Sequence, residues 1–377
     1  MRSEPRRVCL MINDLGLGGA EKQVVLLAEG LRTRGVEPVV LVLFDGGARE
    51  GALRAAGVPV VHLGLARRSA GWRMPFIDAV AFARLVGHLR RLRPDVLHVF
   101  LLNSHLLAAP AAWLARVPVL VAGRRSLGAY KERWPLRRAA ERLANRGTAL
   151  LIANAEAVAE DTRRQEGVPA DKVTVVYNGL PERAFHPAPP AHVDTDLPVV
   201  LCVGNLRAVK GHRYLLDAVG RLGERGTPCT LVLVGEGAER APLERQAAEL
   251  GIDVRFLGAR TDVDQLLARA DLVVSSSLAE GLSNSIMEAM AAGLPVVGTA
   301  VGGTGELLAD GRGVLVPPAD PEALATAIAG LLVDPGSARR TGAAARAWTR
   351  ATLHVDAMVD RHLVIYRDLL LSRRRRG

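Results

Sequence analysis

The feature that most constrains the fold of this chain is an alternation of short apolar runs with amphipathic segments. In the first half of the chain the runs are nearly continuous in apolar residues, and they lie at Val8–Ile12, Pro38–Phe44, Val58–Leu63, Val96–Phe100, Val117–Ala122, Leu150–Ala153 and Val173–Tyr177. Strands of this kind are typical of parallel sheets that helices cover on both faces. Segments with helical periodicity, such as Ala20–Thr33 and Ile77–Leu92, separate the runs. The alternation therefore predicts a doubly wound α/β sheet.

The alternation stops once and then resumes. The stretch His186–Pro198 is rich in proline and polar residues, which is typical of a linker between domains. Beyond it the apolar runs lie at Val199–Val203, Thr230–Val234, Val254–Leu257, Leu272–Ser276, Pro295–Gly298 and Gly313–Val316. The sequence predicts an N-terminal Rossmann-like domain over residues 1–188, a second over residues 189–352, and a C-terminal helix with a basic tail, residues 353–377, that packs back on the first domain. Open parallel sheets bind ligands at the carboxyl ends of their strands, so two such domains would face a central cleft.

Composition and charge narrow the partners. The chain has 377 residues, of which 49% are hydrophobic and 23% charged, and its formal net charge is +10. These values favour a globular protein with acidic partners: phosphates, nucleic acid or an anionic membrane. We expect no nucleic-acid partner, because aromatic residues make up only 4% of the chain and no stacking platform is recognisable. For the basic segment Arg124–Arg146 and the tail Arg373–Arg376, an anionic membrane surface and a solvated basic face both stay open.

The apolar runs also bear on location. None of them reaches the roughly 18–20 residues that a membrane-spanning helix needs, and the start of the chain shows no signal-peptide pattern. We therefore expect a cytoplasmic protein, with peripheral attachment to the inner face of the membrane left open.

Metal and cofactor signatures are weak. The cysteines Cys9, Cys202 and Cys229 lie in or beside apolar runs without the spacing of a zinc site. Asp194-x-Asp196 and Asp262-x-Asp264 match the D-x-D pattern that holds a divalent metal on nucleotide sugars in another fold. The first lies in the expected linker, and the second opens an expected helix, where acidic residues are favoured in any case. We expect no metal site and no cofactor.

A glycine-rich turn, Asn13–Glu21, follows the first expected strand and leads into a helix. Gly18 and Gly19 would let backbone N–H groups approach a phosphate at the start of that helix. The turn is not a full dinucleotide fingerprint, since Glu21 stands where G-x-G-x-x-G requires its last glycine. A phosphate contact and a tight turn without a ligand are both compatible with it.

A basic pair follows the first expected strand of the second domain. Arg207 and Lys210 stand just before a helix that begins near His212, and a diphosphate is a natural counter-ion for such a pair. The alternative is a solvated basic pair. Lys210 is also one of few lysines in a chain whose positive charge is otherwise arginine. The other lysines are Lys22, Lys131 and Lys172. After the next strand, Gly235 would bring the backbone close to a ligand or to the other domain.

The most informative stretch is Glu280–Val297. Glu280 leaves a strand on a loop, and Ser283 and Ser285 can each cap the helix that follows. That helix is apolar nearly all round and therefore buried, and it carries Glu288. The two hydroxyls of a ribose would give a buried carboxylate the donors it needs, and the helix start offers its positive dipole end to phosphate. The alternatives are a capping box between Ser285 and Glu288 and an exposed loop charge at Glu280.

These residues carry a family resemblance. The stretch EGLSNSIMEAMAAGLPVV is similar to the signature of glycosyltransferase family four, the retaining GT-B transferases, in which seven residues separate two glutamates, here Glu280 and Glu288. Further blocks of the family resemble GLGGAE, NAEAVAED, VGNLRAVKG, FLGARTDV and VGGTGELL, so the resemblance covers nearly the whole chain. It implies a GT-B fold of two Rossmann-like domains. It also implies transfer of a sugar from a nucleoside-diphosphate donor to an acceptor hydroxyl, with retention.

The resemblance also implies roles for single residues. Those implied in catalysis are Arg207, Lys210 and Glu280, of which the first two would neutralise the departing diphosphate and the third would contact the donor sugar. Those implied in substrate binding are Gly18, Gly19, His98, Gly235, Ser283, Asn284 and Glu288, with Glu288 on the ribose hydroxyls. Members of the family usually work without a metal.

One region departs from the family pattern. Family members often carry a second histidine two residues after the first, where this chain has Phe100 after His98, and H-x-N where it has Asn103-Ser104-His105. Whether His98 or His105 touches the sugar stays open. A histidine satisfied within the protein at a strand end is an equal alternative for His98.

The favoured function is a hexosyl transferase of cell-surface polysaccharide or glycolipid biosynthesis, with a lipid-linked, glycan or small-molecule acceptor. Two alternatives remain: a nucleotide-sugar epimerase or hydrolase of the same fold, and a non-catalytic binding subunit. The sequence does not name the donor sugar, the base or the acceptor.

Overall fold

The computed structural model describes residues 4–44, 46–65, 79–128 and 135–376. It divides into two compact units, which we call unit 1 (Met1–Gly179 with Val355–Gly377) and unit 2 (Leu180–His354). The proline-rich stretch that the sequence marks as a linker lies wholly within unit 2. The Ala191 N–H donates to the Gln265 carbonyl at 2.9 Å, and the hydroxyls of Thr195 and Thr230 lie 2.6 Å apart. These contacts fasten the stretch to unit 2.

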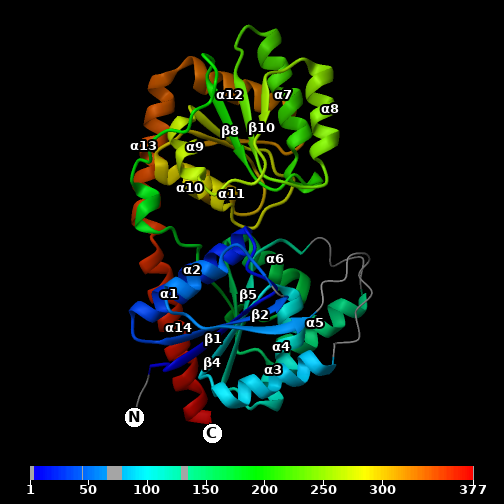
Figure 1. The fold of residues 1–377 in the computed structure, drawn as a ribbon, viewed down its shortest axis with the longest axis vertical. Coiled ribbons are helices and arrows are strands. Elements are labelled where there is room, and N and C mark those ends of the chain that lie inside the picture. Colours follow the sequence, from blue (N-terminus) through cyan, green and yellow to red (C-terminus); the bar gives the residue numbers. More distant parts are fainter. Residues whose placement is uncertain (1–3, 45, 66–78, 129–134, 377) are drawn as a thin grey trace. The chain divides into compact units, whose positions relative to one another are not determined.

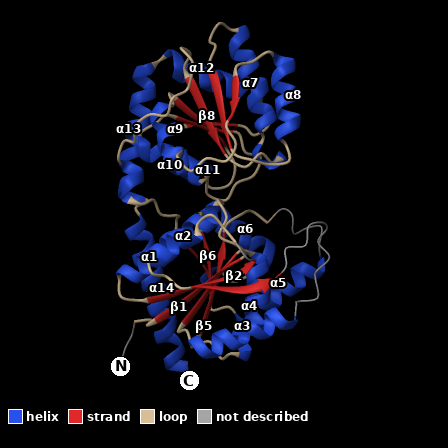
Figure 2. Ribbon diagram, viewed as in Figure 1, coloured by secondary structure: helices blue, strands red, loops and turns tan. Residues whose placement is uncertain are grey.

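Unit 1 is a parallel sheet in the order β3-β2-β1-β4-β5-β6-β7 with helices on both faces (Figures 1 and 2). Its strands are β1 (Arg7–Ile12), β2 (Glu37–Phe44), β3 (Val60–Leu65), β4 (Val96–Phe100), β5 (Val119–Arg124), β6 (Leu150–Ala153) and β7 (Val173–Val175). Its helices are α1 (Gly19–Thr33), α2 (Glu50–Ala55), α3 (Ala79–Leu92), α4 (Leu102–Leu114), α5 (Pro135–Gly147), α6 (Glu156–Glu166) and α14 (Val355–Arg376). Residues 77–78 of the expected helix Ile77–Leu92 lie outside the described residues.

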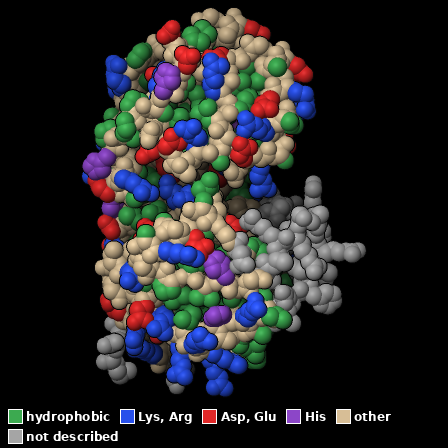
Figure 3. Space-filling view, viewed as in Figure 1, with side chains coloured by type: hydrophobic (Ala, Val, Ile, Leu, Met, Phe, Trp, Pro, Cys, Tyr) green, Lys and Arg blue, Asp and Glu red, His purple; other side chains and the backbone are tan. Residues whose placement is uncertain are grey.

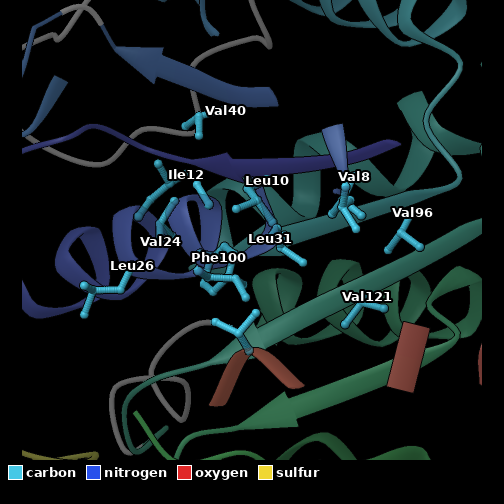
Figure 4. Packing of buried hydrophobic residues seen from close by; sticks show 14 of the residues in the cluster. Val8, Leu10, Ile12, Val24, Leu26, Leu31, Val40, Val96, Phe100 and Val121 are labelled. Atoms are coloured by element: carbon cyan, nitrogen blue, oxygen red, sulfur yellow. The ribbon is translucent and has the colours of Figure 1, made fainter. Parts of the chain in front are cut away.

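The core of unit 1 follows from the period of the strands. In β1, Val8, Leu10 and Ile12 point to the same face and are fully buried (Figure 4). They belong to one apolar cluster with side chains of α1, such as Val24 and Leu31, and with residues of β2, β4 and β5 (Figure 4).

The C-terminal helix α14 also belongs to this core. A Cβ at Gly30 of α1 would lie 2.4 Å from a methyl group of Val359, so this glycine lets the two helices approach closely. At the rim of the same contact, Arg34 donates to Asp356 at 2.9 Å and to Asp360 at 2.5 Å. Helix α14 therefore completes unit 1, although it follows unit 2 in the chain.

Unit 2 is a second parallel sheet, in the order β10-β9-β8-β11-β12-β13. Its strands are β8 (Val199–Val203), β9 (Thr230–Val234), β10 (Val254–Phe256), β11 (Leu272–Ser275), β12 (Val296–Thr299) and β13 (Val314–Val316). Its helices are α7 (His212–Glu224), α8 (Arg240–Leu250), α9 (Val263–Arg269), α10 (Asn284–Ala292), α11 (Thr304–Leu308), α12 (Pro321–Val333) and α13 (Pro335–Thr352).

The two sheets confirm the predicted fold class, an α/β protein of two Rossmann-like doubly wound domains. In each unit the strand order reverses at one point, between β1 and β4 in unit 1 and between β8 and β11 in unit 2. Ligands of open α/β sheets bind at such points, beyond the carboxyl ends of the strands. Among the described helices, none is long and apolar enough to cross a membrane.

Candidate functional site

In unit 2, the loops that leave β8 and β11 interlock at the point where the strand order reverses. The Leu278 N–H donates to the Val209 carbonyl at 2.8 Å, and the Ser276 hydroxyl donates to the Lys210 carbonyl at 3.0 Å. Gly211 has a φ of 64°, and a Cβ there would lie 2.1 Å from the Ser276 carbonyl oxygen. Only glycine fits this position, since it needs both a left-handed backbone and an open side.

Lys210 and Glu280 form an ion pair across these two loops. Their side chains are 26% and 16% exposed, and the Ser277 hydroxyl lies 3.3 Å from the same Glu280 oxygen. The alternative that Glu280 is an exposed loop charge is therefore wrong. An ammonium has three N–H donors, so Lys210 can keep Glu280 and still donate to an anion. Arg207, the other member of the predicted basic pair, lies exposed on the same loop.

A third loop, after β12, closes against the other two. Thr299 donates its hydroxyl to the Ser277 carbonyl at 2.5 Å, and the Gly303 N–H donates to the Gly281 carbonyl at 2.7 Å. Gly302 has a φ of 51°, and a Cβ there would lie 1.8 Å from the Glu280 carbonyl oxygen. The loop that carries Glu280 is therefore held from two sides, by the loops after β8 and β12.

Helix α10 begins at this junction. Its N-cap is Ser283, whose hydroxyl accepts the Ile286 N–H at 3.5 Å and lies 3.0 Å from the Ser285 hydroxyl. The cap is thus Ser283 and not Ser285, so the alternative of a Ser285–Glu288 capping box is wrong. Asn284, the first helical residue, and Glu288 are half-buried, whereas Ile286 is fully buried. Glu288 is therefore less buried than the apolar pattern of the helix predicts, and solvent reaches it.

The glycine turn after β9 packs against the β8 loop. Gly235 has a φ of 145°, and a Cβ there would lie 2.1 Å from the Gly204 carbonyl oxygen. The Gly235 N–H donates to the Gly258 carbonyl at 2.8 Å, and the Leu206 N–H donates to the Glu236 carbonyl at 3.0 Å. The close approach that the sequence assigns to a ligand or to the other domain is thus occupied by a neighbouring loop of the same unit.

In unit 1, Gly18 caps α1 and Gly19 is its first residue. A Cβ at Gly18 would lie 2.1 Å from a carboxylate oxygen of Glu21, so this acidic side chain folds over the start of the helix. The Asp14 carboxylate accepts the Gly16 N–H at 3.0 Å, which tightens the turn. Both contacts agree with the alternative of a tight turn, since the negative Glu21 stands where a phosphate would bind.

His98 lies within the core of unit 1. It is 0% exposed, and its Nδ1 lies 2.7 Å from the hydroxyl of Tyr366 on α14. Burial, and next the neighbouring His362, hold the pKa of His98 well below its usual range. The Tyr366 contact agrees with the alternative, a histidine held within the protein, but only half of it, since the Nε2 of His98 is buried without a hydrogen-bond partner.

His105, in the first turn of α4, is buried too, in a network of side chains that reaches Thr148, just before β6. Its Nε2 lies 2.8 Å from the Thr148 hydroxyl, and its Nδ1 lies 3.4 Å from Arg124. Arg124 in turn donates twice to Glu166, at 2.8 Å each. Just before α4, Leu101 has a φ of 71°, a backbone conformation that costs a non-glycine residue about 1–3 kcal/mol. Strained backbone at the end of β4 is typical of a functional edge.

Several residues that shape these edges carry no motif that would single them out. Ser277 and Thr299 stand at strand ends, where their residue types are unremarkable, and Arg125 is one of many arginines in its segment. Gly302 lies in the block VGGTGELL, and the resemblance of this block to the family is the sequence signal that points to it. In the described part of the chain no three metal-ligating residues gather, and Asp262 of the second D-x-D pairs with Arg260 at 2.6 Å.

Two doubly wound parallel sheets, with charged and glycine-rich loops at the point where the strand order of unit 2 reverses, define a glycosyltransferase of the GT-B class. Family models agree: "Glycosyl transferases group 1" matches residues 197–334, and "Glycosyltransferase Family 4" matches residues 17–183. The chain belongs to glycosyltransferase family 4.

Similar proteins span most of the chain. The lipopolysaccharide core biosynthesis glycosyltransferase LpsE of Rhizobium meliloti is 31% identical, over 84% of this chain and 86% of LpsE. D-inositol 3-phosphate glycosyltransferase 2 of Catenulispora acidiphila is 30% identical, over 98% of this chain and 99% of its own. Among solved structures, Anabaena Alr3699/HepE in complex with UDP-glucose superposes with a TM-score of 0.83 at 25% identity, covering 97% of this chain and 99% of that one.

Proposed function

We propose that this protein is a retaining glycosyltransferase that moves a sugar from a nucleoside-diphosphate donor to an acceptor hydroxyl. The observation that carries the proposal is the junction in unit 2, where the Lys210–Glu280 pair and the start of α10 lie together at the reversal of strand order. A cation, a carboxylate and a helix N-terminus suit the diphosphate and the sugar of such a donor. The UDP-glucose complex of HepE supports a nucleotide sugar as the ligand.

In this proposal each residue of the junction has one task. Lys210 and the exposed Arg207 stabilise the negative charge that develops on the leaving diphosphate, which is catalysis by preorganised electrostatics. The N–H groups at the start of α10, beside Ser283 and Asn284, add the positive end of the helix dipole. Glu280 contacts the donor sugar, and the half-buried Glu288 accepts hydrogen bonds from the ribose.

The finer mechanism follows from the same charges. Departure of the diphosphate leaves an oxocarbenium-like sugar cation, and an oxygen of the leaving phosphate takes the proton of the acceptor hydroxyl. This scheme needs no metal, because Lys210 and Arg207 carry the neutralising charge. Product configuration determined by NMR tests it: retention with full activity in EDTA is expected, and inversion or loss of activity in EDTA contradicts it.

A nucleotide panel read by thermal shift tests the donor. UDP or GDP should raise the melting temperature, and Glu288→Ala or Lys210→Ala should reduce the increase. Unchanged nucleotide binding in both variants would overturn the site assignment. Incubating the nucleotide sugar without an acceptor separates the alternatives. A hydrolase would release the sugar and an epimerase would convert it, whereas a transferase would leave most of the nucleotide sugar intact.

The acceptor and the cellular place belong to the proposal as well. The relative LpsE, named for lipopolysaccharide core biosynthesis, supports a role in cell-surface polysaccharide or glycolipid biosynthesis. We propose that the enzyme acts in the cytoplasm, attached peripherally to the inner membrane face. The attachment rests on the amino edge of the unit 1 sheet, where a cavity of about 990 Å³ is lined by Arg116, Arg146, Lys172 and Arg373.

The same amino edge carries exposed apolar side chains. Trp113 is 79% exposed and Leu114 is 40% exposed, and both line the cavity. Figure 3 shows Lys and Arg side chains gathered at the end of unit 1 where α14 stops. Tryptophan beside basic residues suits the headgroup region of an anionic bilayer.

Vesicle sedimentation tests the attachment. The protein should pellet with vesicles of phosphatidylcholine and phosphatidylglycerol, but not with phosphatidylcholine alone, and high salt should release it. Trp113→Ala should weaken binding, whereas Val333→Ala, at a site 72% exposed on unit 2, should not. Binding that ignores salt, or no binding, removes this part of the proposal.

A further inference from the structure

Arg125 is a half-buried cation at the carboxyl edge of unit 1. It is the first residue after β5, and among the described carboxylates none forms an ion pair with it. Its guanidinium donates to the Asn178 side-chain oxygen and lies over the Phe100 ring, 5.1 Å from the ring centre. Its Nε is fully buried and has no hydrogen-bond partner. The residue as a whole is half-buried, so solvent still reaches part of it.

Such a charge destabilises the free protein. Burial lowers the pKa of Arg125 to about 10, which means that the surroundings disfavour the charged form. Buried charges in proteins are normally paired or bound to a ligand, because desolvation is otherwise uncompensated. The contrast with the preceding residue is direct: Arg124 has the Glu166 carboxylate on two of its nitrogens at 2.8 Å.

The groups that face Arg125 from α14 and β4 do not compensate its charge. His98 and His362 are both 0% exposed, and their Nε2 atoms are buried without a partner. The Nδ1 of His362 lies 2.8 Å from the Met358 carbonyl and must donate to it, so its Nε2 is an acceptor in the neutral ring. Burial lowers the pKa of both imidazoles, so neither adds a charge. Tyr366 is a neutral phenol.

Arg125 also stands where this chain departs from its family. The ring under its guanidinium is Phe100, at the position where family members often carry histidine. A cation and a phenyl ring attract each other, whereas a second imidazole able to take a proton would repel the guanidinium. The neighbouring Gly123 packs closely against the same ring, since a Cβ there would lie 3.3 Å from Phe100 and 3.6 Å from the His98 Nε2.

We propose that Arg125 binds an anionic group, a phosphate or a carboxylate, on the acceptor. The inference rests on the proposed function, since it takes the carboxyl edge of unit 1 as the acceptor side. The planar fork of a guanidinium suits both anions, and an anion there provides the counter-charge that none of the described carboxylates supplies. The acceptor is then an acidic molecule, such as a phosphorylated sugar, a uronic acid or a phospholipid-linked glycan.

Matched sugars test the inference in the presence of saturating UDP, which occupies the diphosphate site of unit 2. Glucose 6-phosphate or glucuronate should raise the melting temperature beyond the UDP value, and glucose should not. Arg125→Gln keeps a donor for Asn178 but loses the charge, so it should abolish the extra increase and keep the UDP increase. Arg125→Lys should restore part of it.

Two further measurements separate binding from structure. Arg142→Gln removes an exposed arginine of α5 in the same unit and should keep the anion effect. Without ligands, Arg125→Gln should melt at the wild-type temperature or above, because it removes a buried unpaired charge; a clear drop would mean that Arg125 is a structural brace and overturn the inference. Equal shifts with glucose and glucose 6-phosphate, or no shift with either anion, would also overturn it. If UDP itself fails to bind, the proposed nucleotide-sugar donor is wrong. The shifts that the anionic sugars cause in wild type and in Arg125→Gln still show whether Arg125 binds an anion.

Discussion

The carboxyl edges of the two sheets handle charge in opposite ways. In unit 2, the cation Lys210 and the carboxylate Glu280 neutralise each other while partly open to solvent. In unit 1, Arg125 is a half-buried cation that pairs with none of the described carboxylates, beside two neutral buried histidines. The first edge is therefore electrostatically complete before a ligand arrives, whereas the second is not.

The backbone is closely packed at both edges. Glycines of unit 2 press against carbonyls of neighbouring loops, with a virtual Cβ at 1.8 Å for Gly302 and 2.1 Å for Gly211 and Gly235. These contacts fix the loops in one arrangement, so the unit 2 edge is rigid. In unit 1, a Cβ at Gly47 would lie 2.4 Å from the Leu15 backbone, and one at Gly123 would lie 3.3 Å from the Phe100 ring. The two edges therefore differ in their charge balance and not in how closely their loops pack. A neutralised pair suits a donor that is the same in every turnover, and an unbalanced charge suits the partner that sets specificity.

The largest expected effect comes from breaking the rigid edge. Gly302→Ala should destabilise the protein by about 3 kcal/mol or more, because the new Cβ meets the Glu280 carbonyl and φ stays left-handed. UDP binding should fall with it. Gly305→Ala, nearby in α11 with no atom within 4 Å of its Cβ, is the control and should leave both nearly unchanged. Chemical denaturation checks both variants, and equal stability of the two would mean that the loops are not interlocked.

Charge at the same edge gives the next largest effect. Lys210→Met should lower the affinity for UDP by roughly 10–100-fold, since a hydrogen bond to a charged group contributes about 1.5–3 kcal/mol. The double variant Lys210→Met with Glu280→Gln removes both charges, so it should recover stability but not UDP affinity. Calorimetric titration measures the affinity.

The control for charge is an ion pair at the far end of α7. Arg225→Met breaks an exposed pair with Glu322 and should leave UDP affinity unchanged. If it weakens UDP as much as Lys210→Met does, the effect reflects net charge and not the site.

The fold was predictable because its pattern is local. Continuous apolar runs such as Val8–Ile12 and Leu272–Ser276 coincide with β1 and β11 almost to the residue, since strands buried on both faces have little freedom in composition. The division of the chain was harder. Proline content predicts a linker at His186–Pro198, but hydrogen bonds to Gln265 and Thr230, distant in sequence, fasten the stretch to unit 2.

The site of unit 2 was predictable to the extent that its residues form a motif. Glu280 and Lys210 stand in stretches that resemble the family, and the structure brings them together. The environment of Arg125 depends on Asn178, Phe100 and α14, which only the tertiary structure assembles. His98 shows the converse, because a histidine at a strand end looks accessible until Tyr366 covers it.

A smaller effect should distinguish the two units: the stability of unit 1 should depend on pH through its buried histidines. His98 and His362 are buried, and burial lowers the pKa of His362 to about 4. The unfolded chain, with a pKa near 6.5, binds protons that the folded chain excludes, so stability falls as pH drops from about 7 toward 4. For His362 the loss is about 2 kcal/mol by about pH 5, above the range in which most carboxylates titrate.

Hydrogen exchange of α14, corrected for the intrinsic rate at each pH, measures this loss locally. His362→Leu should flatten the pH dependence, whereas His186→Leu, an exposed histidine of unit 2, should not. Protection in α14 that is independent of pH in the wild type would show that these imidazoles do not resist protonation.

The smallest effect concerns the ribose and sharpens the assignment of unit 2 as the donor side. Glu288 is half-buried on a helix whose neighbours Met287 and Ala289 are fully buried, so its carboxylate lies beside an apolar wall and within reach of solvent. Wild type should prefer UDP to 2′-deoxy-UDP by about tenfold, which is about 1.4 kcal/mol for one hydrogen bond to a charged acceptor. Glu288→Ala should bind both nucleotides equally, while Glu249→Ala, exposed at the end of α8, should keep the preference. The two nucleotides differ only in the 2′-hydroxyl, and the two proteins differ only in the Glu288 carboxylate. If Glu288→Ala still prefers UDP to 2′-deoxy-UDP, another residue accepts the hydrogen bond from the 2′-hydroxyl.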